Sequence, residues 1–498
     1  MNGENNMERI FTKGTAFVDK EGRERIFNGV NLCDKGVPTN EDETDRKYTY
    51  EYDEKLFRTL AENGFNILRL GTTWEAIEPK PGEYNDEYIE ALRKMLDTCE
   101  KYGIYVYLDM HQDLYSAHCY QWGDGAPEWA CLMGGVKRKN IKLVWAEGYF
   151  WGKGVQTAYD NFWLNKQVNG KGLLDWYADM WKHVAEKLGD HPALFGFDML
   201  NEPFMGKDGG RVFRTLIANL IKTTLTDKRI KKGKLIKDAL KLDIPAILDQ
   251  YNGGILRDVA ASAEALVEKF DRERYTPFLN KTASAIRSAT DNGIMFIDNC
   301  YYSNLSIPCK AGPITYGDKV EDQACFSPHG YDFMVDTPLY KHASSSRTDA
   351  IFGEHENTQK RLGVPVLVGE WGGYSEGNEW YPHVHHLLRF FDDRKWSNTY
   401  WCFHEGLIGD PLMNELNRPY PRAVTGEILS YRHNRENNCF TLIYKQDKEF
   451  DSATICYLPC EPKKVECEGE YEVKALEHGG CELTIKTGVG EHGIFVQL

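Results

Sequence analysis

Two stretches, Phe195-Gly-Phe-Asp-Met-Leu-Asn-Glu-Pro203 and Val364-Pro-Val-Leu-Val-Gly-Glu-Trp-Gly372, each place a glutamate at the end of a short apolar run. Apolar runs of this length, bounded by Gly and Pro, are typical of strands that are buried on both faces of a parallel sheet. The carboxyl ends of parallel strands meet at one edge. The sequence therefore predicts that Glu202 and Glu370 share one mouth.

Around these two stretches, eight strand-like runs can be recognised, and most are followed by a segment with helical spacing, such as 87–102 and 173–188. This alternation implies parallel strands with crossover helices. The count predicts an α/β fold, a closed (β/α)₈ TIM barrel. The runs are 25–32, 66–74, 105–113, 195–203, 293–299, 324–332, 364–372 and 397–405.

The chain of 498 residues exceeds what one core usually serves, so a second, smaller domain is expected. We assign residues 1–424 to the barrel, with two long connections, 114–172 and 204–292, where substrate specificity is usually built. After residue 424 the pattern changes to short alternating strands with Gly, Asn and Asp turns. Residues 425–498 are therefore predicted to form a C-terminal β-sandwich.

Composition excludes some partners. A net charge of -15 argues against nucleic acid. Thirteen cysteines without metal-ligand pairing favour reduced thiols. The N-terminus lacks a signal-peptide pattern and no stretch is suited to span a bilayer. We expect a cytoplasmic protein if the chain is complete, and a secreted one if a leader peptide was removed.

The ends of the predicted strands carry a coherent set of polar and aromatic residues, which a barrel would bring to one face. The set reads Arg69, His111, Asp113, Asn201, Glu202, His329, Tyr331, Glu370 and Trp401 in chain order.

This set suits hydrolysis of a glycosidic bond with retention of configuration, a reaction that requires two opposed carboxylates about 5 Å apart. Glu370 is the predicted nucleophile, because Arg69 and Tyr331 can stabilise its ionised form. Glu202 is the predicted acid/base. Asn201 can bind the sugar 2-hydroxyl, and Trp401 can form the floor of the pocket. No metal or other cofactor is needed.

Several alternatives stay open at this stage. Either glutamate alone could cap a helix, and a His/Asp/Glu group can bind a metal, although Arg69 and Trp401 would have no purpose beside a cation. Trp163 is equally well a core residue or a sugar platform. The basic segment 228–237 can touch an anionic membrane or micelle surface, but a solvated helix face is the favoured interpretation.

In strand order this set resembles glycoside hydrolase family 5 of clan A. Five further stretches resemble its endoglycoceramidase and glucosylceramidase branch: 29–35, 111–113, 125–129, 160–163 and 418–424. The resemblance implies that the ceramide-linked glucose of a glycosphingolipid lies against Lys35, His111, Asp113, Asn201, Tyr331 and Trp401, with Trp163 facing the sugar, Glu202 at the bond to the lipid and His329 among the binding residues.

The expected activity is therefore cleavage between the glycan and the ceramide of a glycosphingolipid, with the oligomeric state left open. The alternatives are an exo-acting glucosylceramidase, a β-glucosidase or β-glucanase on soluble or other amphiphilic β-glucosides, and a non-catalytic glycan- or lipid-binding pseudoenzyme. Secreted endoglycoceramidases carry a leader peptide, whereas the intracellular glucosylceramidase relatives remove a single glucose with the same catalytic residues.

Overall fold

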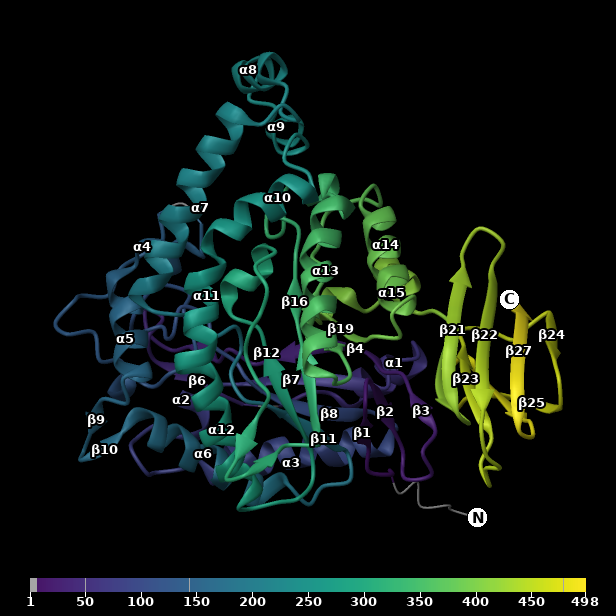
Figure 1. The fold of residues 1–498 in the computed structure, drawn as a ribbon. Coiled ribbons are helices and arrows are strands. Elements are labelled where there is room, and N and C mark those ends of the chain that lie inside the picture. The colour runs from purple at the N-terminus through teal and green to yellow at the C-terminus, as the bar shows by residue number, and fades with distance from the viewer. Residues whose placement is uncertain (1–6, 50, 143, 478) are drawn as a thin grey trace.

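The computed structural model describes residues 7–49, 51–142, 144–477 and 479–498. Its centre is an eight-stranded parallel sheet, wrapped by helices (Figure 1). The strands, in spatial order, are β15 (Ala324–Ser327), β12 (Ile294–Asp298), β11 (Leu194–Asp198), β8 (Tyr105–Met110), β7 (Ile67–Thr72), β4 (Asn28–Cys33), β19 (Ser397–Tyr400) and β17 (Leu367–Val368).

The sheet closes on itself, because a parallel bridge joins Phe326 of β15 to Val366 beside β17. Beyond it, β16 (His329–Gly330) pairs with β18 (Glu370–Trp371), so that His329 is the register partner of Glu370. Every residue of β7, β8, β11 and β12 is buried, as expected for strands covered on both faces. The predicted (β/α)₈ barrel is confirmed.

Helices cover the outside of the barrel through one apolar stripe each. In α3 (Asp86–Lys101), the side chain of Asn85 caps the first turn by accepting from the Tyr88 N–H, and Leu92 and Leu96 are buried. Further helices between strands include α1 (Glu54–Glu62), α6 (Leu173–Leu188), α12 (Thr276–Arg287), α13 (Ser345–Leu362) and α14 (Tyr381–Asp392).

The connections differ in length. The β12–β15 connection contains the short turn η4 (Tyr301–Leu305) and the hairpin β13–β14 (Thr315–Tyr316, Lys319–Val320) in place of a crossover α-helix. Region 114–172 contains α4 (Glu147–Trp151) and α5 (Lys153–Trp163). Region 204–292 contains α7 (Lys207–Thr226), α8 (Lys232–Leu240), α9 (Ile244–Leu248), α10 (Gly253–Ala260), α11 (Glu264–Phe270) and α12.

An aromatic cluster fills the amino-terminal end of the barrel. The rings of Phe27 and Phe195 meet edge to face at 4.9 Å between centroids, and Phe17 and Tyr105 pack around them. This end of the barrel is therefore packed with apolar side chains, and the opposite end carries the polar residues at the strand termini.

The C-terminal region forms two antiparallel sheets, which confirms the predicted β domain; it lies at the right of Figure 1. One sheet contains β21 (Glu427–Asn434), β22 (Cys439–Gln446), β24 (Lys464–Cys467) and β27 (Gly490–Gln497). The other contains β23 (Thr454–Leu458), β25 (Glu470–Ala475) and β26 (Cys481–Lys486), and continues through β20 (Tyr420–Val424) into the N-terminal strands β1–β3 (Phe11–Lys13, Ala16–Val18, Glu24–Arg25).

The predicted boundary at residue 424 therefore falls inside a continuous sheet. β20 precedes the boundary, yet it pairs with β23 on one side and with β3 on the other. The sequence could not indicate this, because strands from the two ends of the chain form the sheet together. The exact limits of the two domains stay a prediction.

Candidate active site

The two predicted catalytic glutamates face each other at the carboxyl end of the barrel. One carboxylate oxygen of Glu202, one of Glu370 and a ring nitrogen of His329 all lie within 4.8 Å of one another. Both glutamates are buried, at 6% and 5% exposure. A separation this short suits direct attack by one carboxylate and leaves too little room for a water molecule aligned for inversion.

Glu370 is surrounded by hydrogen-bond donors. Its Oε1 accepts from Arg69 Nη1 at 2.6 Å, and its Oε2 accepts from the Tyr331 hydroxyl at 2.8 Å. His329 Nδ1 lies 3.6 Å from Oε2. Each carboxylate oxygen of Glu370 therefore has its own hydrogen-bond donor, and one of the two donors is charged. The two donors predicted around Glu370, Arg69 and Tyr331, are both found there.

Arg69 is fully buried and lies beside three carboxylates. Its Nη2 lies 3.0 Å from Asp109 Oδ1 and 2.9 Å from Asp198 Oδ2, and its Nη1 contacts Glu370. Burial raises the pKa of Asp198 to about 7, although the charge of Arg69 opposes this change. Arg69 thus links Glu370 to two buried carboxyls of the barrel interior.

Glu202 has the opposite environment. Burial, reinforced by the negative charge of Asp113, raises the pKa of the Glu202 carboxyl to about 7, while a hydrogen bond from Asn304 Nδ2 to Oε1 (2.6 Å) opposes the rise. The Glu202 backbone adopts a φ of 39°, and its N–H donates to Asp298 Oδ2 at 2.8 Å. This bond holds a backbone conformation that non-glycine residues rarely adopt.

His329 connects the two glutamates. Its Nδ1 lies 3.0 Å from Glu202 Oε1, and its backbone N–H donates to Asn299 Oδ1. Burial lowers the pKa of the imidazole to about 3, so the ring is neutral at physiological pH. A neutral ring adds no charge between the two carboxyls, and its Nδ1 can form a hydrogen bond with the Glu202 carboxyl.

Asn201 lies against Arg69. Its Oδ1 accepts from Arg69 Nη2 at 2.9 Å, and its Nδ2 donates to the Gln112 carbonyl at 3.1 Å. An amide oxygen has two lone pairs, so Oδ1 retains one acceptor position for a sugar hydroxyl. The predicted contact with the 2-hydroxyl is compatible with this arrangement.

A second polar group contains Lys35, Asp113 and Asp124. The Lys35 ammonium contacts Asp113 Oδ2 directly and lies 3.2 Å from Asp124 Oδ2. Burial by itself would raise the pKa of Asp113, but Lys35 and His111 outweigh this and lower it well below the usual range. This group therefore presents charged donors and acceptors of the kind that bind sugar hydroxyls.

His111 and Trp401 lie beside this group. The two rings are nearly parallel, with centroids 5.3 Å apart and an interplanar angle of 11°, and Lys35 Nζ lies 5.6 Å from the Trp401 centroid. Burial lowers the pKa of His111, but the charge of Asp109, which is hydrogen-bonded to Nδ1 at 2.8 Å, and the Asp113 carboxylate 3.6 Å from Nε2 reverse this and raise it to about 10. The cationic ring is a hydrogen-bond donor at the mouth.

Within the described part of the chain, two groups of side chains have donor atoms close enough for a metal: His111, Asp113 and Asp124, and the set formed by Glu202, His329 and Glu370. In the first group Lys35 already provides a cation, and a protonated His111 has no lone pair for a metal. In the second group Arg69 provides the positive charge. The residues present therefore fit sugar chemistry better than metal binding.

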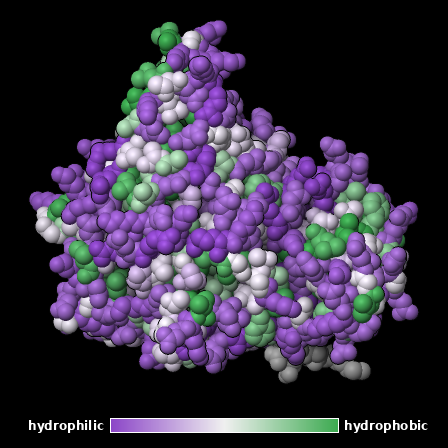
Figure 2. Space-filling view, in the orientation of Figure 1, coloured by the Kyte–Doolittle hydropathy of each residue, from purple (hydrophilic) through white to green (hydrophobic). Residues whose placement is uncertain are grey.

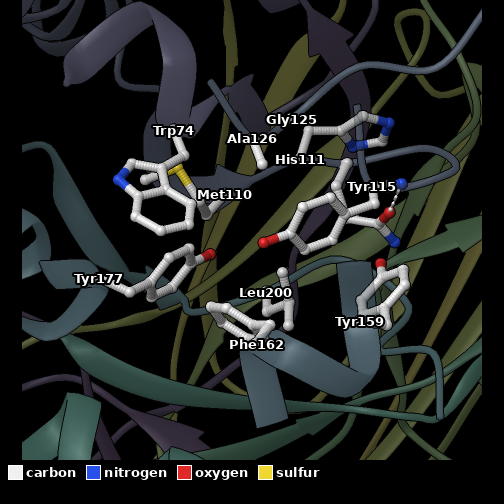
Figure 3. A pocket seen from close by; sticks show the side chains of 11 residues that line it. Trp74, Met110, His111, Tyr115, Gly125, Ala126, Tyr159, Phe162, Tyr177 and Leu200 are labelled. Carbon is white, nitrogen blue, oxygen red and sulfur yellow. Dashed lines mark hydrogen bonds between the residues drawn. The ribbon is translucent and has the colours of Figure 1, made fainter. Parts of the chain in front are cut away.

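A small cavity of about 20 Å³ lies behind His111, lined by aromatic side chains (Figure 3). In Figure 3 the rings of Trp74, Tyr115, Phe162 and Tyr177 surround it, with His111 at one side. A volume of this size holds about one water molecule and no sugar. The cavity belongs to the packing that supports the site from behind.

Trp163 is not brought to the glutamates by any described contact. It is 6% exposed, its Nε1 donates to the Phe204 carbonyl at 2.7 Å, and its ring packs on Phe270 and Phe278. It also lines a separate cavity of about 160 Å³ beside Met205. This geometry supports the core interpretation of Trp163, and its sugar contact stays an untested prediction.

Two residues beside Glu202 were not among the predicted site residues. Asp298 ends β12 and holds the Glu202 backbone, and Asn304 in η4 contacts the Glu202 carboxyl. The pair Asp298-Asn299 does end the fifth predicted strand, so the same strand-end rule could have indicated this position. No local signal indicates Asn304, because its contact depends on the path of the turn after the strand.

The family model described as cellulase (glycosyl hydrolase family 5) matches residues 18–406, which is most of the chain. The chain belongs to glycosyl hydrolase family 5. The model of the glycoside hydrolase family 5 C-terminal domain matches residues 418–493. The family resemblance predicted from the motifs is confirmed.

Family 5 relatives with curated names include an endoglycoceramidase from Hydra vulgaris, 33% identical over 38% of this chain and 39% of that protein. Endoglycoceramidase I from Rhodococcus hoagii is 24% identical over 83% of this chain and 72% of that protein. Solved structures of endo-glycoceramidase II from Rhodococcus sp., as a lactosyl-enzyme intermediate and as a ganglioside GM3 complex, share the fold, with a TM-score of 0.71, 22% identity and coverage of 97% of this chain and 99% of theirs.

Among the described residues, no helix combines the length and the apolar character that crossing a bilayer requires.

Proposed function

We propose that this family 5 protein is a retaining β-glycosidase that hydrolyses the bond between the glycan and the ceramide of glycosphingolipids. One observation carries the proposal: Glu202 and Glu370 approach within 4.8 Å at one mouth, in unequal surroundings. One carboxyl is held by Arg69 and Tyr331, and the pKa of the other is raised to about 7. Two carboxyls in different environments can take different roles, one as the nucleophile and the other as the acid.

In the first step, Glu370 attacks the anomeric carbon while protonated Glu202 donates its proton to the departing glycosidic oxygen. The carbon–oxygen bond to the ceramide breaks, and an ester bond to Glu370 forms. Arg69 and Tyr331 orient the attacking carboxylate through one hydrogen bond to each oxygen.

In the second step, Glu202 acts as the base. The loss of its proton in the first step, together with neutralisation of Glu370 in the ester, leaves Glu202 ionised and able to accept a proton from water. The activated water attacks the anomeric carbon and releases Glu370. Two displacements restore the original anomeric configuration, and no cofactor takes part.

The curated names of the relatives support a glycosphingolipid substrate. The Hydra and Rhodococcus relatives are named endoglycoceramidases, and the solved Rhodococcus structures include a ganglioside complex. Lys35 and Asp113 of the second polar group, with His111 beside them, suit the hydroxyls of the ceramide-linked glucose. Exo-acting removal of glucose from an amphiphilic glucoside is the second candidate, since the same catalytic pair would serve it.

The substrate is tested by the sugar released from lactosylceramide. Intact lactose is the expected product, at a rate well above the turnover of cellobiose or cello-oligosaccharides. Cleavage of glucosylceramide without release of lactose from lactosylceramide would favour the exo-acting candidate, whereas release of galactose would point to another specificity. Turnover of cellobiose without any lipid turnover would contradict the proposed substrate and leave a soluble β-glucosidase.

The pH dependence tests the role of Asn304. Because Glu202 must be protonated and its pKa is about 7, kcat/KM is expected to fall as the pH rises above 7. Asn304→Leu removes a hydrogen bond that favours the ionised carboxylate, so it should move this fall to higher pH, by about one unit. The measurement is kcat/KM against pH on an aryl β-lactoside. The exposed Asn437→Leu is the control; a downward shift for Asn304→Leu would contradict the role.

A further inference from the structure

The long insertion between β11 and β12 ends in a projecting arm. We define the arm as residues 217–249, the far part of α7 with α8 and α9 at its tip, seen at the top of Figure 1. Helix α7 starts at Lys207, five residues after Glu202, and its 20 residues extend about 30 Å. The arm is therefore joined to the catalytic face, but its tip is far from the glutamates.

The arm exposes an unusual share of aliphatic side chains. Among the described residues, twenty large hydrophobic side chains are exposed, and seven of these fall within residues 217–244. Two of them, Leu240 and Leu242, are more than three quarters exposed, at 83% and 80%. Figure 2 shows apolar side chains along this projection. The seven are Ile217, Ile221, Leu225, Ile236, Leu240, Leu242 and Ile244.

On α7 these side chains form one stripe, since Ile217, Ile221 and Leu225 follow each other at intervals of four residues. One step earlier, Phe213 packs edge to face on Trp151 of α4, with centroids 5.8 Å apart, and Trp151 is 47% exposed. The apolar stripe thus runs from the body of the protein to the tip of the arm.

The arm is basic, although the protein is acidic. Residues 222–243 contain eight Lys and Arg against three Asp, a net charge of +5, whereas the whole chain carries -15. Arg229 pairs with Asp227 and Lys234 with Asp238. The other six have no ion-pair partner among the described residues: Lys222, Lys228, Lys231, Lys232, Lys237 and Lys241.

We infer that the arm docks the protein on an anionic lipid bilayer, with its aliphatic side chains inserted at the surface and its unpaired lysines at the level of the phosphates. Exposed aliphatic side chains interleaved with lysines match a surface that is apolar below a negative layer. A second copy of the same arm would bring like charges together. This inference rests on the proposed function, which gives the docking its purpose, because a substrate anchored by ceramide lies in a bilayer.

Flotation of the full chain with lipid vesicles tests the inference directly. The wild type should float with phosphatidylcholine vesicles that contain phosphatidylserine, and should float weakly with phosphatidylcholine alone or at high salt. Lys228→Ser/Lys232→Ser/Lys237→Ser should weaken the association about 100-fold, at about fivefold for each lysine. Ile236→Ser/Leu240→Ser/Leu242→Ser should weaken it at least tenfold.

The matched control is Leu429→Ser/Ile443→Ser/Val489→Ser, three exposed aliphatic residues of the C-terminal region, which should bind vesicles like the wild type. Turnover of a soluble aryl β-lactoside should be equal in all variants and shows that each is folded. Turnover of lactosylceramide in phosphatidylserine vesicles should fall with binding in the arm variants.

Three results would overturn the inference: a wild type that does not float with anionic vesicles, arm variants that float equally well, or light scattering that shows a wild-type dimer and monomeric arm variants. The last result would assign the arm to contact between copies. A protein that binds vesicles but turns over no glycoside would leave the arm in place and contradict the proposed function alone.

Discussion

Glu370→Gly is expected to lower the hydrolysis of a lactoside by on the order of 10⁴-fold or more, because it removes the attacking atom while leaving Arg69 and Tyr331 in place. The vacated space lies between two hydrogen-bond donors that previously held a carboxylate, so a small anion can enter it. Azide should therefore restore turnover of an activated substrate, dinitrophenyl β-lactoside. The rate of dinitrophenolate release is the measurement.

The product of this rescue identifies the residue that was lost. Azide in the place of the nucleophile attacks once, from the face opposite the leaving group, and should yield the α-glycosyl azide. The exposed Glu376→Gly, six residues later, is the matched control and should retain wild-type turnover. A Glu370→Gly variant that stays active, or that yields the β-glycosyl azide, would contradict the assignment of Glu370 as nucleophile.

Glu202→Ala is expected to lower turnover of lactosylceramide about 10²–10⁴-fold, because the alkoxide of ceramide cannot depart without a proton. Dinitrophenolate departs without one, so the first step on dinitrophenyl β-lactoside should stay fast. The covalent intermediate should then accumulate, since no base activates water. Stopped-flow measurement should show a burst of dinitrophenolate followed by slow turnover.

In this variant azide attacks the covalent intermediate, and the double displacement should yield the β-glycosyl azide, the opposite anomer to that of Glu370→Gly. The fall of kcat/KM above pH 7 should disappear, because the group with the raised pKa is gone. Asp208→Ala at the exposed start of α7 is the control. Equal losses of kcat/KM on lactosylceramide and on the dinitrophenyl substrate, or the absence of a burst, would contradict an acid/base role.

These two results would separate the proposed enzyme from a glycan- or lipid-binding pseudoenzyme. A binding protein needs neither of the unequal environments, whereas catalysis by double displacement needs both. Arg69 and Tyr331 on one carboxyl, and burial with Asn304 on the other, are difficult to explain by sugar recognition alone.

The meeting of the strand-end residues at one face could be predicted from the sequence, and the reason is geometric. In a closed parallel barrel every strand ends at the same face, so Arg69, Glu202, His329 and Glu370 had to converge once the fold was recognised. The contacts between Arg69 and Glu370 and between His329 and Glu202 follow from that convergence. Trp163 is different, because it lies on a helix of a long connection, where a motif does not indicate which way the ring points.

The basic segment 228–237 shows a similar limit. Its charges favour a solvated helix face, and the lysines are indeed exposed. The local sequence does not reveal that Ile236, Leu240 and Leu242 are exposed as well, since aliphatic residues at helical spacing normally indicate a buried stripe. Exposure of both kinds of side chain on one arm is a property of the folded molecule.

The barrel and its catalytic pair follow from the amino-acid order, because short apolar runs form buried parallel strands and place whatever follows them at one mouth. The contacts that give the two glutamates unequal surroundings are set by the folded protein. Proton affinity depends on burial and on neighbouring charges. Those neighbours come from distant parts of the chain: Asn304 is 102 residues from Glu202, and Arg69 is 301 residues from Glu370.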